Sequence, residues 1–192
     1  EFKKENFQLE KYKDYQEKFD INHSKVAAQK FRYIEPPTEI KSILRSEKVM
    51  EIFKEITSKN NFEVWRDPGF GWLGYRIIRP ISNDGYPASC KNWGFAAGVY
   101  SAWVPIAGCN DQSSIRLLKG SHKKEYQKYL PENSKFTKGE YRLAEEIDQK
   151  EYIRLDCNLG DIIIYHPAMI HSEDTSDKSS TRTNLEYRFT PL

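Results

Sequence analysis

The residues with the greatest capacity for chemistry lie in the last segment of the chain. Arg182, Asn184, Glu186 and Arg188 occupy every second position there, with less polar residues between them. Side chains two apart in an extended strand share a face, so this strand would have one charged face. Two interpretations are open: a solvated edge strand, or a strand whose charged face lines an internal polar cavity. In the second, the planar guanidinium fork of Arg182 could bind a carboxylate.

Thiol chemistry is not indicated by the cysteines. Cys90, Cys109 and Cys157 are odd in number, widely spaced and form no Cys-x-x-Cys arrangement. This pattern predicts neither a disulfide framework nor a thiolate metal site. A thiol pKa lowered by Lys91 is conceivable for Cys90, but no base or orienting partner accompanies it in the sequence. We therefore expect free, buried thiols.

Length and charge limit the class of protein. The 192 residues suffice for one domain with a sizeable core, and 30 Lys and Arg are balanced by 28 Asp and Glu. A formal charge of +2 does not favour a nucleic-acid or membrane partner. No run of eighteen apolar residues occurs, and residues 1–10 are too charged for a signal peptide. We expect a cytoplasmic protein whose partner is a small molecule; its oligomeric state is left open.

The elements that must position these side chains are helices followed by strands. Residues 1–60 are charged and contain helical patterns, so they predict a helical portion that packs on the core. Residues 61–192 contain short segments rich in Val, Ile, Tyr and Trp, separated by turn residues. This texture predicts a mainly β, jelly-roll-like double sheet in a single domain, with a charged insertion near 119–149. Strands are expected at 62–66, 72–79, 98–106, 114–118, 152–156, 161–165 and 182–190.

Three blocks in the second half of the chain resemble the phytanoyl-CoA dioxygenase-like family. The first runs from Ala102-Trp103-Val104-Pro105-Ile106 to Gly120-Ser121-His122, and the second is Leu159-Gly160-Asp161 followed by a strand that ends in His166-Pro167. The third is Met169-Ile170-His171-Ser172 with Arg182 eleven residues after His171. The order of the blocks carries the resemblance, which covers roughly residues 76–192.

The resemblance implies a double-stranded β-helix with Fe(II) and 2-oxoglutarate as cofactors. In that family a His-x-Asp pair and a distal His hold Fe(II), which leaves positions for 2-oxoglutarate and oxygen. By this resemblance His171 is the distal metal ligand and Arg182 binds the far carboxylate of 2-oxoglutarate. Trp103 and Asn184 would line the same cosubstrate site.

The sequence departs from the family where the His-x-Asp pair should stand. Alignment of Pro87 and Trp93 with the family puts Ser89 in place of the His and Lys91 in place of the Asp. An ammonium group repels a divalent cation that a carboxylate would attract. Asp84 is a candidate replacement ligand, whereas His166 matches a His that does not bind metal in the family.

The same stretch supplies candidate residues for a substrate pocket. These are Ser89, Lys91, Trp93 and Arg76, although Lys91 could instead point to solvent. Arg76 and Arg79 lie three apart on one expected strand, so one should enter the cavity and the other should cap the sheet edge.

Two functional hypotheses follow. One is a 2-oxoglutarate/Fe(II) oxygenase that hydroxylates a small organic substrate. The other is a metal-free family member, without redox turnover, that binds an anionic or carbohydrate-like ligand or a partner protein. Ser89 and Lys91 separate the two hypotheses.

Overall fold

The structure is a computed structural model that describes residues 35, 38–66, 73–79, 86–94, 96–132, 141–173 and 181–192. Two helices, α3 (Thr38–Leu44) and α4 (Glu47–Thr57), precede the strands. The expectation for residues 1–34 lies outside the described residues. Within the described part, no helix is long and apolar enough to span a bilayer.

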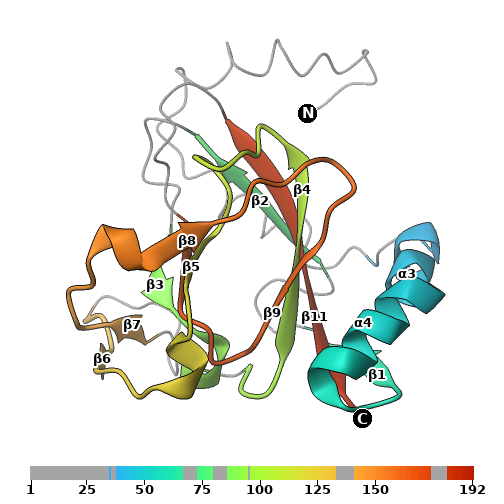
Figure 1. Ribbon diagram of the computed structural model, residues 1–192, viewed down its shortest axis with the longest axis horizontal. Coiled ribbons are helices and arrows are strands. Elements are labelled where there is room, and N and C mark those ends of the chain that lie inside the picture. The colour runs from blue at the N-terminus through green and yellow to red at the C-terminus, as the bar shows by residue number, and fades with distance from the viewer. Residues whose placement is uncertain are drawn as a thin grey trace.

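Two antiparallel sheets form the body of the molecule (Figure 1). The larger sheet has the order β1-β11-β4-β9, with β2 also paired to β11, and the smaller has the order β3-β10-β5-β8. The strands of the larger sheet are β1 (Phe62–Val64), β2 (Gly74–Ile78), β4 (Tyr100–Ala107), β9 (Ile163–Tyr165) and β11 (Arg182–Pro191). Those of the smaller are β3 (Tyr86–Ser89), β5 (Arg116–Leu118), β8 (Tyr152–Arg154) and β10 (His171–Glu173).

The remaining elements are short. A two-stranded ribbon of β6 (Lys128–Tyr129) and β7 (Arg142–Leu143) falls within the expected insertion. Three 3-10 turns complete the list: η2 (Lys91–Trp93), η3 (Ser121–Lys123) and η4 (Gln149–Glu151). The mainly β, jelly-roll-like fold class expected from the sequence is confirmed.

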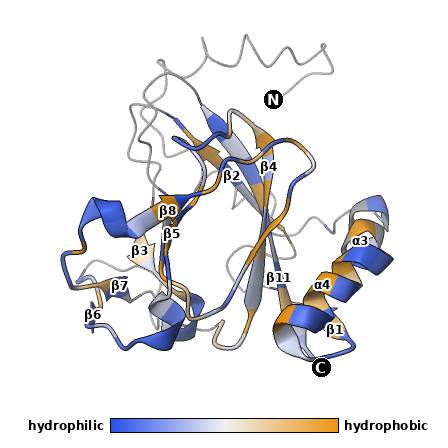
Figure 2. Cartoon of the chain, viewed as in Figure 1, coloured by the Kyte–Doolittle hydropathy of each residue, from blue (hydrophilic) through white to orange (hydrophobic). Residues whose placement is uncertain are grey.

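Helix α4 covers one face of the larger sheet. Phe53 is 1% exposed, and its ring lies 4.7 Å from that of Phe62 and 4.8 Å from that of Phe189. Apolar residues alternate with hydrophilic ones along α4 (Figure 2), as expected for a helix with one buried face. Ala102 and Tyr187 belong to the same apolar cluster, so the side chains on this face of β4 and β11 are used for packing.

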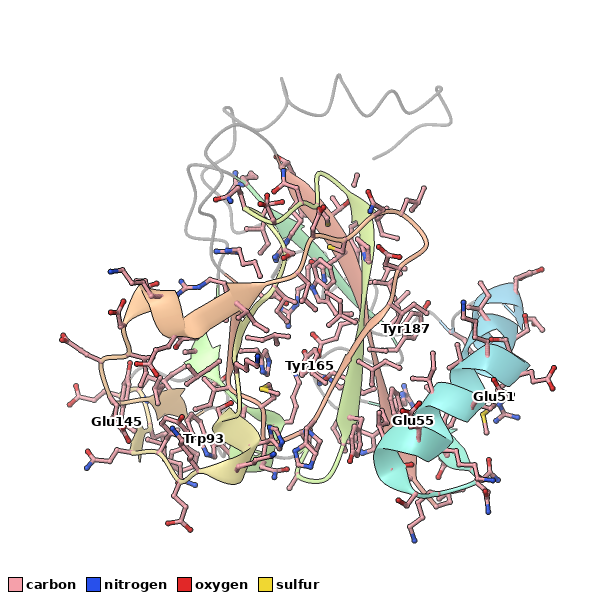
Figure 3. All side chains as sticks on the ribbon, viewed as in Figure 1. Glu51, Glu55, Trp93, Glu145, Tyr165 and Tyr187 are labelled. Carbon is pink, nitrogen blue, oxygen red and sulfur yellow. The ribbon has the colours of Figure 1, made fainter. Side chains whose placement is uncertain are left out.

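The opposite face of the larger sheet packs against the smaller sheet. Trp103 and Tyr165 from the larger sheet form one apolar cluster with Ile115 and Leu117 from the other side. In Figure 3 the Tyr165 side chain lies between the two sheets, whereas Tyr187 lies on the side of α4. Every second side chain of β4 and β11 therefore points into the interior between the sheets, as the two-residue period of a strand requires.

The solvated-edge interpretation of residues 182–190 is wrong. β11 is the longest strand and pairs with β4 along one side and with β1 and β2 along the other. Arg182, Asn184, Glu186 and Arg188 are all buried. Their alternation reflects a polar interior rather than a face in contact with water.

Candidate functional site

The interior contains a network of buried charged side chains centred on two carboxylates. Glu186 Oε1 lies 2.8 Å from Lys91 Nζ and 3.0 Å from Arg188 Nε, and Glu186 Oε2 lies 3.7 Å from Arg76 Nη2. Ser101 Oγ donates to Glu186 Oε1 at 3.3 Å. Burial alone would raise the pKa of Glu186, but Lys91 and Arg76 outweigh burial and lower it to about 2. Glu186 is therefore an ion at every pH at which the protein is expected to work.

Glu173 is the second buried carboxylate. It is 3% exposed, and its Oε2 lies 3.3 Å from Arg182 Nη2 and 3.8 Å from Arg76 Nε. Arg182 also donates from Nη1 to the carbonyl oxygen of Ser113 at 2.9 Å. Its guanidinium carbon lies 5.5 Å from the centre of the Trp103 ring. Arg182 is thus held by a carboxylate, a carbonyl and an aromatic ring of its own chain.

His171 lies at the centre of the smaller sheet. It is the cross-strand partner of Ser89 on β3 and of Leu117 on β5. Its Nδ1 lies 2.9 Å from the carbonyl oxygen of Met169. Because a carbonyl can only accept, Nδ1 carries the proton and Nε2 keeps a free electron pair. Burial and the charge of Lys91 lower the pKa of His171 to about 4, so the ring is neutral at neutral pH.

The residues proposed for the cosubstrate site lie on neighbouring strands. Trp103 and Asn184 are both 0% exposed, and Asn184 is flanked by Arg76 on β2 and Pro105 on β4. Among the described residues, no hydrogen-bond partner is found for Trp103 Nε1 or for either amide atom of Asn184. Such atoms lose solvation on burial without compensation, and each costs about 1–3 kcal/mol when left unpaired. They are therefore candidates for contact with a ligand or a buried water.

Lys91 does not point to solvent. Its side chain is 13% exposed and forms the shortest ion pair of this charged network, with Glu186. It follows β3 in turn η2, so the register that sets Ser89 opposite His171 also directs Lys91 inward. Trp93, in the same turn, packs instead with Cys90, Leu118 and Ile170. The substrate-pocket residues proposed from sequence are thus divided between the charged network and a separate apolar cluster.

The predicted roles of Arg76 and Arg79 also need revision. Both are 5% exposed, so neither caps a solvated sheet edge. Arg76 contacts Glu173 and Glu186, as expected for a side chain that enters the interior. Asp84 lies outside the described residues, so its proposed role as a metal ligand stays a prediction.

Sequence reasoning missed Glu173 altogether. It stands two residues after His171 on β10, so the two share a face of the sheet. That spacing was visible in the sequence, but the segment is short and polar and does not resemble a strand. All three cysteines are free thiols; Cys90 and Cys157 are buried, as expected, whereas Cys109 is only partly buried.

The residues present do not form the donor set that Fe(II) prefers. His171 offers a neutral Nε2, but the positions that should supply an imidazole and a carboxylate are Ser89 and Lys91. Within the described ranges, no group of three His, Cys, Asp or Glu side chains could hold a metal ion. An ammonium group repels a dication, and the charge of Lys91 already acts on His171, where it helps to lower the pKa of the ring. The ammonium of Lys91 therefore opposes a metal at His171.

Comparison by sequence gives no match to any protein-family model and none to a curated protein. The resemblance to phytanoyl-CoA dioxygenases therefore stays a prediction. Comparison by structure does find similar proteins, and three of them have 11–14% sequence identity to this chain. The non-heme monooxygenase ThoJ, in its apo form, has a TM-score of 0.55 and 14% identity, over 79% of this chain and 54% of that one.

Two further neighbours are complexes with 2-oxoglutarate (alpha ketoglutarate), one of them also with Fe3+. The epimerase SnoN, in complex with Fe3+, alpha ketoglutarate and nogalamycin RO, has a TM-score of 0.57 and 11% identity, over 81% of this chain and 59% of its own. EvdO2 from Micromonospora carbonacea var. aurantiaca, complexed with 2-oxoglutarate, has a TM-score of 0.57 and 12% identity, over 81% and 64%. The chain spans less than two thirds of each of these proteins. The chain shares the cupin-like, jelly-roll fold of these three proteins.

Proposed function

We propose that this chain is a metal-free protein on the 2-oxoglutarate oxygenase fold, which binds a small polar molecule in its interior without redox turnover. The ion pair of Lys91 with Glu186, 2.8 Å long and next to His171, carries the proposal. A fixed ammonium group provides the local positive charge that a metal ion would otherwise provide. The oxygenase hypothesis requires a metal ligand outside the described residues, such as Asp84, to displace this lysine.

The hydrogen-bonding groups of the interior favour a neutral, carbohydrate-like or amide-like ligand over an anion. Lys91, Arg182, Glu173 and Glu186 already contact opposite charges, so the interior cations have carboxylate partners within the chain. Trp103 Nε1 and the Asn184 amide are neutral and together offer two kinds of donor and one acceptor. A hydroxyl or amide of a ligand would satisfy them without introducing a charge.

Titration with Fe(II) and 2-oxoglutarate under anaerobic conditions tests the metal-free claim. We expect no visible charge-transfer band and, on exposure to air, no succinate above the level released by iron in buffer. In equilibrium dialysis, the native chain should bind Fe(II) no more tightly than a His171→Asn variant does. A band and stoichiometric succinate from the native chain would establish the oxygenase hypothesis instead.

Thermal denaturation with small molecules tests the ligand class. A panel of neutral monosaccharides should raise the midpoint of the native chain more than succinate does at equal concentration and ionic strength. Asn184→Leu has nearly the same side-chain shape but lacks both polar atoms, so it should abolish the increase. Asn158→Leu, at an exposed position, is the matched control and should respond like the native chain. A larger response to succinate that survives Asn184→Leu would contradict a neutral ligand at this place.

A further inference from the structure

We infer that Glu173 is a built-in replacement for a cosubstrate carboxylate: it occupies the guanidinium of Arg182 and closes this anion site to external carboxylates. The inference rests on the proposed function, since a protein that does not consume 2-oxoglutarate has no need to keep Arg182 open. It concerns the surroundings of Arg182, whereas the proposed function concerns the surroundings of Lys91. The chain would then contain its own charge in place of the metal and its own carboxylate in place of the cosubstrate.

The geometry around Arg182 carries the inference. The resemblance assigns to this arginine the far carboxylate of 2-oxoglutarate. In the structure Glu173 Oε2 lies 3.3 Å from Arg182 Nη2, and the two side chains are 4% and 1% exposed. A buried arginine without a carboxylate would leave an uncompensated charge, which is strongly unfavourable. Glu173 compensates it from within the chain.

The place of Glu173 in the fold explains how it reaches the site. β10 belongs to the smaller sheet, and Arg182 begins β11 in the larger one. The pair therefore links the two sheets across the interior, and Arg76 on β2 approaches the same oxygen at 3.8 Å. Because Glu173 and His171 share a face of β10, the strand that would present the metal ligand also presents the blocking carboxylate.

A site closed in this way predicts a specific response to removal of the carboxylate. Glu173→Ala deletes the charge and leaves room beside the guanidinium, so a small external carboxylate can take its place. Glu173→Gln also deletes the charge but keeps the volume, so that room is not created. Both variants should lose stability, but only the alanine variant should regain it with acetate.

The experiment compares thermal midpoints in acetate and in chloride at equal ionic strength, with EDTA present to exclude metal. We expect acetate to raise the midpoint of Glu173→Ala at least three times as much as it raises that of the native chain or of Glu173→Gln. Titration calorimetry with 2-oxoglutarate alone should show binding at least tenfold tighter to Glu173→Ala than to the native chain. Glu63→Ala, at an exposed position of β1, is the control and should behave like the native chain.

Equal effects of acetate and chloride on Glu173→Ala would overturn the inference, as would equal affinities of the variant and the native chain for 2-oxoglutarate. Should Glu173→Ala not fold in chloride, recovery of native circular dichroism in acetate alone would support the inference, and recovery in neither salt would overturn it. Because no metal is present, these results are independent of the iron titration. Failure here leaves the metal-free claim standing, whereas a charge-transfer band in the iron titration would require 2-oxoglutarate to bind the native chain and would contradict both claims.

Discussion

Ser89 and His171 face each other as cross-strand partners of β3 and β10. The backbone therefore retains the arrangement in which an imidazole at position 89 and a carboxylate at position 91 would join His171. What separates this site from a metal site is the chemistry of two side chains.

Replacement of both residues should create a metal site. We expect Ser89→His/Lys91→Asp to bind Ni(II), a redox-stable probe, at least tenfold more tightly than the native chain in isothermal titration. Ser89→His alone should gain little, because the Lys91 ammonium still repels the ion. Addition of His171→Asn to the double variant should remove the gain. If that third change has no effect, the metal is bound elsewhere and the prediction fails.

The sequence was sufficient to predict the fold class from the texture of residues 61–192, whereas the interior place of Arg182 followed only from the resemblance, because the alternation alone also fitted a solvated edge. The spacing between His171 and Arg182 can be read directly from the sequence. So can the alternation of polar residues after Arg182. The partner of Lys91 is not local: it depends on the register of β3 against β10 and on the path of β11 across the other sheet. No pattern in a single sequence fixes that register.

Two strands of the smaller sheet were missed for a related reason. β3 and β10 are only four and three residues long, and they contain Pro87 and the polar run His171-Ser172-Glu173. β3 has a single aromatic residue, Tyr86, and β10 has no β-branched or aromatic residue, so neither carries the usual composition of a strand. They are stabilised by pairing in the smaller sheet, which is a tertiary effect. Because β10 was missed, Glu173, whose carboxylate pairs with Arg182, was also missed.

The ion pair of Lys91 with Glu186 should contribute to stability. Lys91→Met leaves Glu186 with Arg188 and Arg76 as its remaining cations, so we expect a loss of about 2 kcal/mol in the free energy of unfolding, below the full cost of breaking a buried pair. The measurement is urea denaturation at pH 7. Lys150→Met, at an exposed position, should change stability by less than about 0.5 kcal/mol.

A double-mutant cycle separates the pair from its surroundings. Lys91→Met/Glu186→Gln removes both charges, and its loss should be smaller than the sum of the two single losses by about 1–3 kcal/mol. Additive losses would indicate that Lys91 and Glu186 do not interact.

Gly108 should be the glycine least tolerant of substitution. It follows the last residue of β4 with φ of +65°, and a Cβ there would lie 2.0 Å from the carbonyl oxygen of Thr181, immediately before Arg182. Backbone strain and a clash with main-chain atoms act together, so Gly108→Ala should cost about 3 kcal/mol or more. Gly120→Ala has a similar φ of +78° but meets no atom within 4 Å, so it should cost about 1 kcal/mol. Similar thermal midpoints for the two variants would show that the close approach to Thr181 is absent.

The free energy of unfolding should decrease in two steps as the pH is lowered. The first step belongs to His171. Its pKa is about 4 in the folded chain, below the ordinary value of 6.5, because the ring is buried beside Lys91. Between these values the unfolded chain binds more protons than the folded one, so acid favours unfolding. The contribution of the neutral ring is therefore complete above pH 6.5 and is lost as the pH falls towards 4. The shift corresponds to roughly 3 kcal/mol.

The second step belongs to Glu186, whose folded pKa of about 2 lies below its ordinary value of 4.5 because of Lys91 and Arg76, despite burial. Its contribution is complete above pH 4.5 and disappears as the pH falls towards 2. Urea denaturation at pH 7, 5.5 and 4.5 isolates the first step, since Glu186 remains ionised in both states over most of that range. The variant His171→Asn keeps an N–H donor for the carbonyl oxygen of Met169 but cannot titrate. Its free energy of unfolding should therefore change less with pH between pH 7 and 4.5 than that of the native chain. Equal slopes for the two proteins would mean that the folded chain accepts a proton at His171 as readily as the unfolded chain does, and that Lys91 does not act on the ring.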